Sequence, residues 1–421
     1  MYSRSLAVEA VSLCPIDSSN EKMKSYLSKI GSIAKEIRRE GLVVGGRKVF
    51  HSAKTLANLM RKAPPGDILY VAGGAMGNST YYRVHNQKEE LELHGLKCSV
   101  TAQDSPWLST YADKFSLFIF HRVLFNRNVA KFIDSIKKLG KDILFETDDL
   151  IYDPYYLKFM DFYGELNALE KMQYQNGLGG EILNGAYVTT CITSTSYLAE
   201  KLREKGKQVF ISTNKISNHE SALAEDILKS SKKPEDGYIR IGYYSGTNTH
   251  NKDFAGITDA LMEILGRYKN VKLLLAGPLS VEDRLNAFRD RLEILPRVPR
   301  DQYFWNIYKS DINLAPLELD NPFCEAKSEI KFTEPGILEI PTVAVRNRTF
   351  SEAIDDGEDG LLAGNTAEWI EQIGKLIQDA GLRRQIGKRA REKVLRDYTN
   401  PNSHNEEFYA YLRSRTAHSG R

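Results

Sequence analysis

The chain has 421 residues, of which 42% are hydrophobic, 10% aromatic and 27% charged, and its formal net charge is +3. This composition is typical of a globular protein, and the length favours two or three domains. The small net charge gives no indication of nucleic-acid binding, and no apolar run reaches the roughly 18 to 20 residues that a membrane span needs. The N-terminus lacks the apolar stretch and cleavage site of a secretory signal. The scattered cysteines form no CxxC pair and are expected to be reduced thiols of a cytoplasmic protein: Cys14, Cys98, Cys191 and Cys324.

Residues 1–66 are predicted to form an N-terminal helical, basic extension. Apolar residues recur at helical spacing between Met23 and Ile37, and Pro64-Pro65-Gly66 then breaks the pattern. Residues 1–65 contain twelve Lys or Arg and five Asp or Glu. Such a surface is suited to peripheral contact with the anionic inner face of a membrane, where each basic residue contributes about 1 kcal/mol. The alternative is a solvated basic helix face, which is common on soluble proteins.

Strands and helices then alternate in two stretches, which we interpret as domains at 67–216 and 238–400. In the first, strands are expected at 67–72, 97–101, 117–121, 142–145 and 187–193, with helices ending near 94 and spanning 128–139. In the second, strands are expected at 238–243, 271–276, 292–295, 311–314 and 342–345, with helices at 254–268, 329–338 and 367–396. The polar residues 217–237 are interpreted as a linker, and 401–421 as a C-terminal tail that crosses back to the first domain.

This alternation predicts an α/β fold with two doubly wound parallel-sheet (Rossmann-like) domains that face a cleft. Parallel strands need crossover helices, which cover both faces of each sheet. In such sheets ligands bind beyond the carboxyl ends of the strands. Residues that follow a strand are therefore the first candidates for the site.

One candidate is the turn within residues 241–254, where a strand leads through Gly, Ser, Thr and Asn residues into a helix. Small residues let backbone N–H groups approach an anion, and a helix N-terminus supplies roughly half a positive charge. Ser245 and Gly246 lie in this turn, and His250 and Lys252 are placed to add donors. The turn is therefore a candidate phosphate site, and the alternative is a merely polar turn.

A second candidate lies in residues 321–345, where Lys327, Lys331 and Glu334 stand at i, i+4 and i+7. On one helix face this spacing places two cations and a carboxylate together. Two lysines suit a diphosphate, and a carboxylate suits two vicinal hydroxyl groups. An exposed ion-pair face has the same pattern, but this helix opens a βαβ unit and leads into an apolar strand.

Together these two stretches resemble the nucleotide-binding half of the retaining GT-B glycosyltransferases of family 4, the "glycosyl transferases group 1" domain. The resemblance rests on the Ser-Gly-Thr-x-Thr-His turn, on Asn-Pro-Phe (321–323) followed by Lys-Ser and Lys before Glu334, and on the acidic, glycine-rich segment 350–362. It covers residues 238–400 well and 67–214 more weakly. It implies the GT-B fold and a nucleotide diphosphate sugar as donor.

The resemblance also implies roles for particular residues. Glu334 matches the motif glutamate that binds the ribose hydroxyls of the donor, and Lys252 matches the basic residue of the turn, with Lys331 or Lys327 sharing the diphosphate. The first motif glutamate falls on Ala326, so that the contact to the donor sugar is open and Glu325 is the neighbouring substitute. The expected donor-binding residues are Gly74, Ser245, Gly246, His250, Lys252, Lys327, Ser328, Lys331 and Glu334.

In the first domain, Gly73-Gly74 and Gly77 look like the family's glycine-rich loop, with an ordinary tight turn as the alternative. Ser79, Tyr82 and Arg83 follow on the next helix. His121 ends an apolar strand where the family often carries an active-site histidine, although a histidine at a strand end also occurs in structural roles. The expected catalytic residues are His121, Lys252 and Lys331, and the expected acceptor-side residues are Tyr82, Arg83 and Asp149.

The acidic run 146–149 superficially resembles the metal motif of GT-A glycosyltransferases. Because the phosphate-like turn lies about a hundred residues later in another domain, we expect no metal and no cofactor, and assign the paired acids to the acceptor side. The predicted function is metal-independent, retaining transfer of a sugar from a nucleotide diphosphate sugar to a glycan or lipid-linked acceptor, in polysaccharide or glycoconjugate synthesis. A nucleotide-sugar epimerase of GT-B architecture and a non-catalytic subunit of a polysaccharide assembly complex remain as alternatives.

Overall fold

The computed structural model describes residues 61–73, 78–160, 163–166, 168–246, 251–277, 279 and 283–417. Residues 59–421 belong to one compact unit. The expected N-terminal extension up to residue 60, together with Gly74 and His250, lies outside the described residues.

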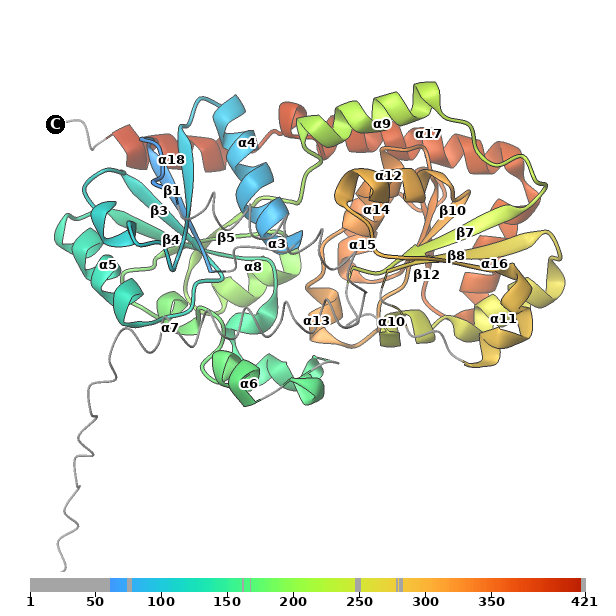
Figure 1. The fold of residues 1–421 in the computed structure, drawn as a ribbon, viewed down its shortest axis with the longest axis horizontal. Helices are drawn as coiled ribbons and strands as arrows, with labels where there is room; N and C mark the ends of the chain where they lie inside the picture. The colour runs from blue at the N-terminus through green and yellow to red at the C-terminus, as the bar shows by residue number, and fades with distance from the viewer. Residues whose placement is uncertain are drawn as a thin grey trace, which may run out of the picture. The chain divides into compact units, whose positions relative to one another are not determined.

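The first sheet has six parallel strands in the order β2-β1-β3-β4-β5-β6 (Figure 1). Its central strands are short apolar runs without alternation, because helices cover both faces of a parallel sheet. The strands are β1 Ile68–Ala72, β2 Cys98–Ala102, β3 Leu117–His121, β4 Asp142–Thr147, β5 Thr190–Thr193 and β6 Gln208–Ile211. Its register places His121, the last residue of β3, opposite Glu146 of β4.

The helices of this half begin with an unusual segment after the first strand. A short α3 (Asn78–Thr80) runs into a π-helix, η1 (Tyr81–Asn86), and then into α4 (Gln87–Leu93). π-helical turns are rare and are frequent at functional sites. The other α-helices are α5 Arg127–Lys138, α6 Ala168–Tyr174, α7 Gly180–Leu183 and α8 Ser196–Arg203, and the 3₁₀ segments are η2 Leu108–Thr110, η3 Leu150–Tyr152, η4 Pro154–Phe159 and η5 Tyr163–Glu165.

The second sheet also has six parallel strands, in the order β12-β11-β10-β7-β8-β9. The strands are β7 Ile239–Tyr244, β8 Val271–Ala276, β9 Leu292–Leu295, β10 Ile312–Ala315, β11 Thr342–Val345 and β12 Leu361–Ala363. The helices are α10 Asn251–Ala255, α11 Thr258–Arg267, α12 Arg300–Tyr308, α13 Pro322–Glu325, α14 Ile330–Gly336, α15 Arg348–Ala353, α16 Thr366–Gln378 and α17 Ala380–Asp397, with 3₁₀ segments η7 Asp283–Arg291 and η8 Asn400–Asn402. Two parallel sheets with helices confirm the predicted α/β class.

Several expected elements differ from the structure. The segment 217–237, interpreted as a linker, contains α9 (Asn218–Ser230), which starts with a capping box of Ser217 and Glu220 and buries Ala224 and Ile227. The single helix expected at 367–396 is two helices, because Asp379 leaves helical geometry and caps α17 through its side chain. The helix expected at 254–268 is likewise divided into α10 and α11.

The chain passes between the two sheets at residues near 216 and again near 399, and these two passages pair with each other. The Ile216 N–H donates to the carbonyl of Tyr398 at 2.7 Å, and the Asn400 N–H donates to the carbonyl of Ile216 at 3.0 Å. The last helix, α18 (Glu406–Thr416), then packs on the first sheet, where its three buried apolar residues join the core of β1, β2 and β3: Phe408, Tyr409 and Leu412. The tail thus returns to the first half of the chain (Figure 1).

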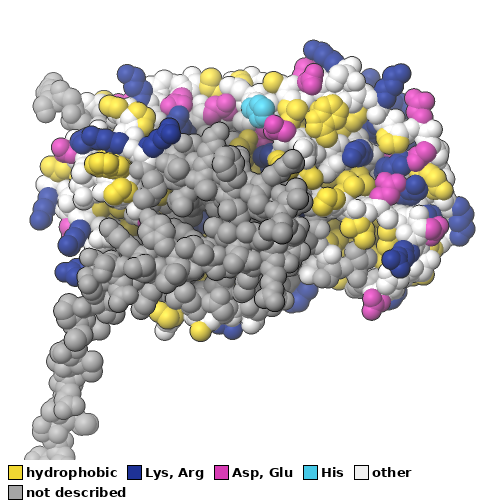
Figure 2. All heavy atoms as spheres, in the orientation of Figure 1, with side chains coloured by type: hydrophobic (Ala, Val, Ile, Leu, Met, Phe, Trp, Pro, Cys, Tyr) yellow, Lys and Arg dark blue, Asp and Glu magenta, His cyan; other side chains and the backbone are white. Residues whose placement is uncertain are grey.

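On the face drawn in Figure 2, Lys and Arg side chains alternate with Asp and Glu over the part of the surface that is described. Among the described residues, no helix combines the length and apolar character that crossing a bilayer requires. The cysteines in this part of the chain, Cys98, Cys191 and Cys324, are buried and form no disulfide.

Candidate functional site

Three buried side chains form the centre of the site at the carboxyl ends of β3 and β4. Because β3 and β4 pair in parallel register, His121 and Glu146 face each other, and Nδ1 of His121 hydrogen-bonds to Oε2 of Glu146. Arg83 of η1 donates from Nε to the other oxygen, Oε1, at 2.6 Å. All three side chains are at most 1% exposed. A buried carboxylate is costly unless it is paired, and here Glu146 is paired on both oxygens.

Arg83 also connects this centre to the passage between the two sheets. Its Nη1 donates to the carbonyl of Ser212 at 2.6 Å and to Oδ1 of Asn214 at 3.0 Å. Asn214 in turn donates to Oγ of Ser328, a predicted donor-binding residue, at 2.8 Å. Arg83 was expected on the acceptor side, but its hydrogen bonds in this structure are made within the protein.

A second set of contacts surrounds the acidic run after β4. Ser79 Oγ lies 2.9 Å from Nε2 of His121 and 2.9 Å from Oδ1 of Asp148. Arg122 donates from Nε to the same Asp148 oxygen at 2.8 Å. Burial would raise the pKa of the Asp148 carboxyl, but the positive charges around it, that of Arg122 first, together with the Ser79 hydrogen bond outweigh burial and hold this pKa well below its usual range. Asp148 is therefore a carboxylate at neutral pH.

Asp149, an expected acceptor-side residue, contacts Lys327, an expected donor-binding residue. Its Oδ1 caps η3 by accepting from the Leu150 N–H at 2.9 Å, while its Oδ2 lies 3.1 Å from Nζ of Lys327. Arg122 is 3.6 Å from the same oxygen. The acids of this run thus face cationic side chains, and no group of three or more His, Cys, Asp or Glu residues with metal-binding geometry occurs in the described ranges.

Glu334, the predicted ribose-binding residue, is buried in α14 and accepts hydrogen bonds on both oxygens. Tyr82 of η1 and Arg300 of α12 donate to Oε1, the latter at 2.7 Å, and Tyr303 donates to Oε2 at 2.7 Å. Arg300 also pairs with the buried Glu220 of α9. The structure therefore brings together Tyr82 and Glu334, which the sequence assigned to opposite sides of the site.

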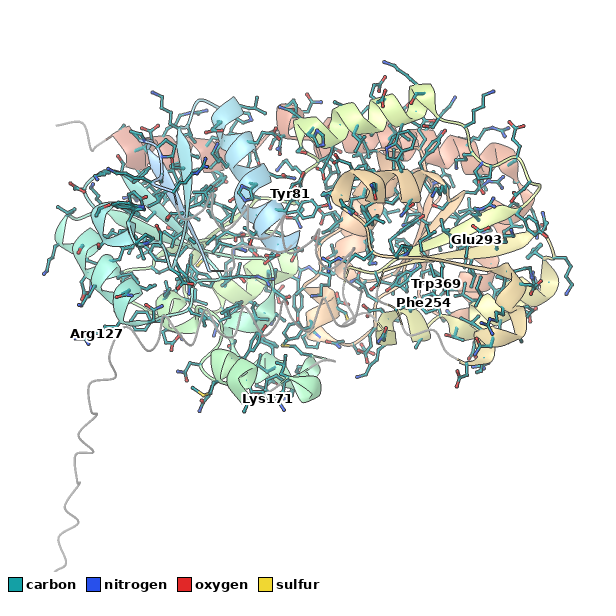
Figure 3. The ribbon with its side chains drawn as sticks, viewed as in Figure 1. Tyr81, Arg127, Lys171, Phe254, Glu293 and Trp369 are labelled. Carbon is teal, nitrogen blue, oxygen red and sulfur yellow. The ribbon has the colours of Figure 1, made fainter. Side chains whose placement is uncertain are left out.

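The guanidinium of Arg300 lies between aromatic rings as well as between carboxylates. Its Cζ is 4.7 Å from the ring centres of both Tyr81, which is labelled in Figure 3, and Tyr82. The Tyr81 hydroxyl is 3.2 Å from Oγ of Ser217, at the start of α9. Cation–π contacts of this kind fix the plane of the guanidinium and add to its ion pairs.

Lys331, one turn before Glu334 on α14, reaches the carboxyl end of β7. Its Nζ donates to the carbonyl of Tyr244 at 2.6 Å and lies 4.4 Å from the ring centre of Tyr243. Desolvation by burial lowers the pKa of Lys331 to about 8, more than the attraction of Asp253 and Glu334 raises it. The side chain is therefore mostly an ammonium at neutral pH and loses this charge just above it.

The predicted phosphate turn is described in part. Ser245 donates its N–H to the carbonyl of Ala276 at 2.8 Å, and the backbones of β7 and β8 come so close here that a Cβ on Gly277 would lie 2.0 Å from the carbonyl oxygen of Ser245. Lys252 is exposed on α10, which has five residues. Phe254 anchors this helix, with its ring centre 4.9 Å from that of Tyr243 on β7 (Figure 3).

The helix that was expected to carry three site residues on one face begins only at Ile330. Lys327 and Ser328 precede it in a loop, so that Lys327 points to Asp149 while Lys331 and Glu334 remain on α14. The predicted single face of two lysines and one glutamate is therefore wrong. Lys327 lies in the loop between α13 and α14, apart from Lys331 and Glu334 on the helix.

Position 326, where the family motif has its first glutamate, is buried in this structure. Ala326 is fully buried and packs with the core of the first sheet. Glu325 accepts from the Arg348 N–H at 3.2 Å, at the start of α15. Glu325 thus serves a helix terminus in this structure.

Sequence reasoning missed three residues that complete the site: Arg300, Tyr303 and Glu220. Arg300 and Tyr303 lie 34 and 31 positions from Glu334 in the chain, so that their contacts arise from tertiary packing. The only local signals were the helix start after Pro299 and the capping box at Ser217 and Glu220. Neither signal indicates a functional role by itself.

The pairing of Arg83 with Glu146 predicts a large loss of stability when one partner is removed. Arg83→Met leaves Glu146 buried with one unpaired oxygen, and we expect the free energy of unfolding to fall by about 3–5 kcal/mol. Arg127→Met, which removes an exposed arginine of α5, should change it by less than about 0.5 kcal/mol. Chemical denaturation of both variants measures the difference, and equal stabilities would contradict the buried pairing.

Comparisons with known proteins agree with this architecture. Residues 258–405 match the family model described as glycosyl transferase-like. Similar solved structures include a glycosyltransferase from Rickettsia africae (TM-score 0.57, 12% identity, covering 82% of this chain and 98% of that one) and HepE from Anabaena in complex with UDP-glucose (0.54, 12%, 83% and 99%). Sucrose-phosphate synthase from Thermosynechococcus elongatus is a third (0.54, 14%, 83% and 98%). No curated protein matches the chain. The chain has the GT-B fold of these structures, and the match of residues 258–405 to the glycosyl transferase-like model supports the predicted enzyme class.

Proposed function

We propose that this protein is a metal-independent, retaining glycosyltransferase of the family 4 type, which transfers a sugar from a UDP-sugar to a glycan or lipid-linked acceptor. The choice of uridine follows HepE, whose fold is similar and which binds UDP and UDP-glucose. The observation that carries the proposal is the position of Lys331 and Glu334 one turn apart on α14, inside the segment that matches the glycosyl transferase-like model. An ammonium and a carboxylate one helical turn apart suit the diphosphate and the ribose of one nucleotide.

In this proposal the cations of the second half act on the leaving group. As the bond between the sugar and the diphosphate breaks, negative charge grows on the phosphate oxygens while the sugar becomes oxocarbenium-like. Lys331 and Lys252, with the turn at Ser245 and Gly246, stabilise that charge without a divalent ion. Glu334 fixes the nucleoside and so the orientation of the reacting carbon.

Binding of the ribose requires an exchange of hydrogen bonds at Glu334. Both of its oxygens already accept from protein donors, namely Tyr82, Arg300 and Tyr303. Of these, Tyr82 comes from η1, which belongs to the first half of the chain and is preceded by the glycine-rich segment. We propose that a ribose hydroxyl replaces the hydroxyl of Tyr82, while Arg300 and Tyr303 keep the carboxylate in place.

The acceptor would approach from the first half, where His121 and Asp149 end or follow strands β3 and β4. Peripheral contact of the basic residues 1–66 with an anionic membrane would suit a lipid-linked acceptor. The buried Ala326 favours no specific sugar contact, and the sugar of the donor is therefore not part of the proposal. The same fold hosts many specificities.

Calorimetric titration with UDP tests the donor site. We expect the protein to bind UDP in the presence of EDTA, and Glu334→Gln and Lys252→Gln each to weaken binding by about tenfold, because each removes a charge-assisted hydrogen bond worth roughly 1.5 kcal/mol. Lys269→Gln, an exposed lysine of the same half, is the matched control. Unchanged affinity in both site variants, or binding that needs Mn²⁺, would reject this site.

The pKa of Lys331 predicts how this binding depends on pH. Because the pKa is lowered to about 8 and only the ammonium attracts the diphosphate, UDP affinity should fall about tenfold between pH 7 and pH 9. In Lys331→Gln the affinity should be lower at pH 7 and nearly constant over this range, whereas Lys269→Gln should behave as the unaltered protein does. An affinity of the unaltered protein that stays constant up to pH 9 would remove Lys331 from the phosphate site.

A further inference from the structure

A buried chain of hydrogen bonds joins His121 to acidic side chains on both sides of its ring. On one side Nδ1 contacts Oε2 of Glu146, and on the other Nε2 lies 2.9 Å from Oγ of Ser79. Ser79 Oγ is in turn 2.9 Å from Oδ1 of Asp148. His121 and Glu146 are fully buried, so that the protein itself must satisfy the contact between them, whereas the side chain of Asp148 is 14% exposed.

The hydrogens available in these contacts determine whether Nε2 of His121 is protonated. The Ser79 hydroxyl has a single hydrogen, and an ionised Asp148 can only accept. Two oxygen atoms at 2.9 Å with no hydrogen between them would repel, so the Ser79 hydrogen points to Asp148. Ser79 Oγ must then accept from His121, which requires a hydrogen on Nε2.

The protonation of the other ring nitrogen, Nδ1, follows from its contact with Glu146. Arg83 donates from Nε to Oε1 of Glu146 at 2.6 Å, and the two side chains form a buried ion pair. A carboxylate oxygen that contacts Nδ1 requires a hydrogen on the ring nitrogen. With a hydrogen on each nitrogen, the ring is an imidazolium.

We infer that Ser79 and Glu146 are positioning residues that hold His121 in its doubly protonated form, so that in the reaction it acts as a cation and hydrogen-bond donor and not as a base. The charged groups around the ring are Glu146 and Asp148, with Arg83 and Arg122 behind them and the Asp149–Lys327 pair beyond. These charges cancel, and the imidazolium adds one positive charge at the carboxyl end of β3. Its use in catalysis rests on the proposed function, while its protonation follows from the contacts alone.

This assignment bears on the outcome of the reaction. An inverting transfer needs a base that takes the proton of the acceptor hydroxyl, and an imidazolium cannot do so. A hydrogen-bond donor at this place can instead stabilise negative charge on the departing diphosphate or bind a hydroxyl of the donor sugar. A substrate oxygen that replaces Ser79 Oγ would accept the same Nε2 hydrogen.

Nitrogen NMR of the full-length chain with ¹⁵N-labelled histidine rings tests the inference without any substrate. His121→Gln identifies the signals of His121. At pH 7.5, where a solvent-exposed imidazole is mostly neutral, we expect both ring nitrogens of His121 to show the shifts of protonated nitrogen. In Ser79→Ala the Nε2 signal should shift toward unprotonated nitrogen, and Ser79→Thr, which keeps the hydroxyl, should restore it.

Ser135→Ala, which removes an exposed hydroxyl of α5, is the matched control and should leave the His121 signals unchanged. A neutral His121 ring of either tautomer at pH 7.5, or an imidazolium that persists unchanged in Ser79→Ala, would overturn the inference. Titration of the same labelled sample with UDP tests the proposed function separately. An imidazolium in a protein that does not bind UDP would contradict that function and leave the protonation assignment intact.

Discussion

Two consecutive side chains of η1 each donate to a buried carboxylate, and the candidate site is arranged around these two contacts. Tyr82 donates to Glu334 of α14, and Arg83 donates to Glu146 of β4. A buried carboxylate is destabilising unless charges and hydrogen bonds offset its desolvation, so that Arg300 and His121 complete the two pairings. Because one short π-helical segment reaches both acids, any displacement of η1 changes the two parts of the site together. This coupling gives a physical reason for an unusual helix geometry at this place.

The strands could be predicted because a parallel strand is a short apolar run, and β3, β8, β9 and β11 begin and end where the sequence indicated. Helix α9 could not be predicted, because its sequence is polar like that of a linker and only a few of its residues are buried. The spacing and the family resemblance singled out Glu334 and Lys331 as candidates, but they did not indicate the partners of these two residues in the structure. Arg300 reaches Glu334 through the packing of α12 beside α14, which local sequence does not encode. The local sequence likewise did not indicate that a loop precedes α14. Because α14 begins only at Ile330, Lys327 lies outside the helix and not on the expected face.

Protein groups occupy the positions where substrate groups are expected. Ser79 contacts His121, Tyr82 contacts Glu334, and the carbonyl of Tyr244 accepts from Lys331. In the proposed function, substrate binding would exchange these internal hydrogen bonds for new ones, and the net affinity would be the difference between the two sets. Such an arrangement keeps each polar group paired in the free protein and makes the donor site depend on a movement of η1. The internal hydrogen bonds and ion pairs also offset the free-energy cost of burying the charged residues of the site.

The affinity of Tyr82→Phe for UDP, measured by calorimetry, tests most directly whether Glu334 is the nucleoside anchor. The substitution keeps the ring that packs on Arg300 and removes the hydroxyl, which donates to Glu334 and accepts from Arg300. The account predicts UDP binding about fivefold tighter than in the unaltered protein, since one competing hydrogen bond of about 1 kcal/mol is lost. Tyr81→Phe, whose hydroxyl contacts Ser217 and not Glu334, should leave the affinity unchanged. UDP binding that is weaker or unchanged in Tyr82→Phe would contradict the account.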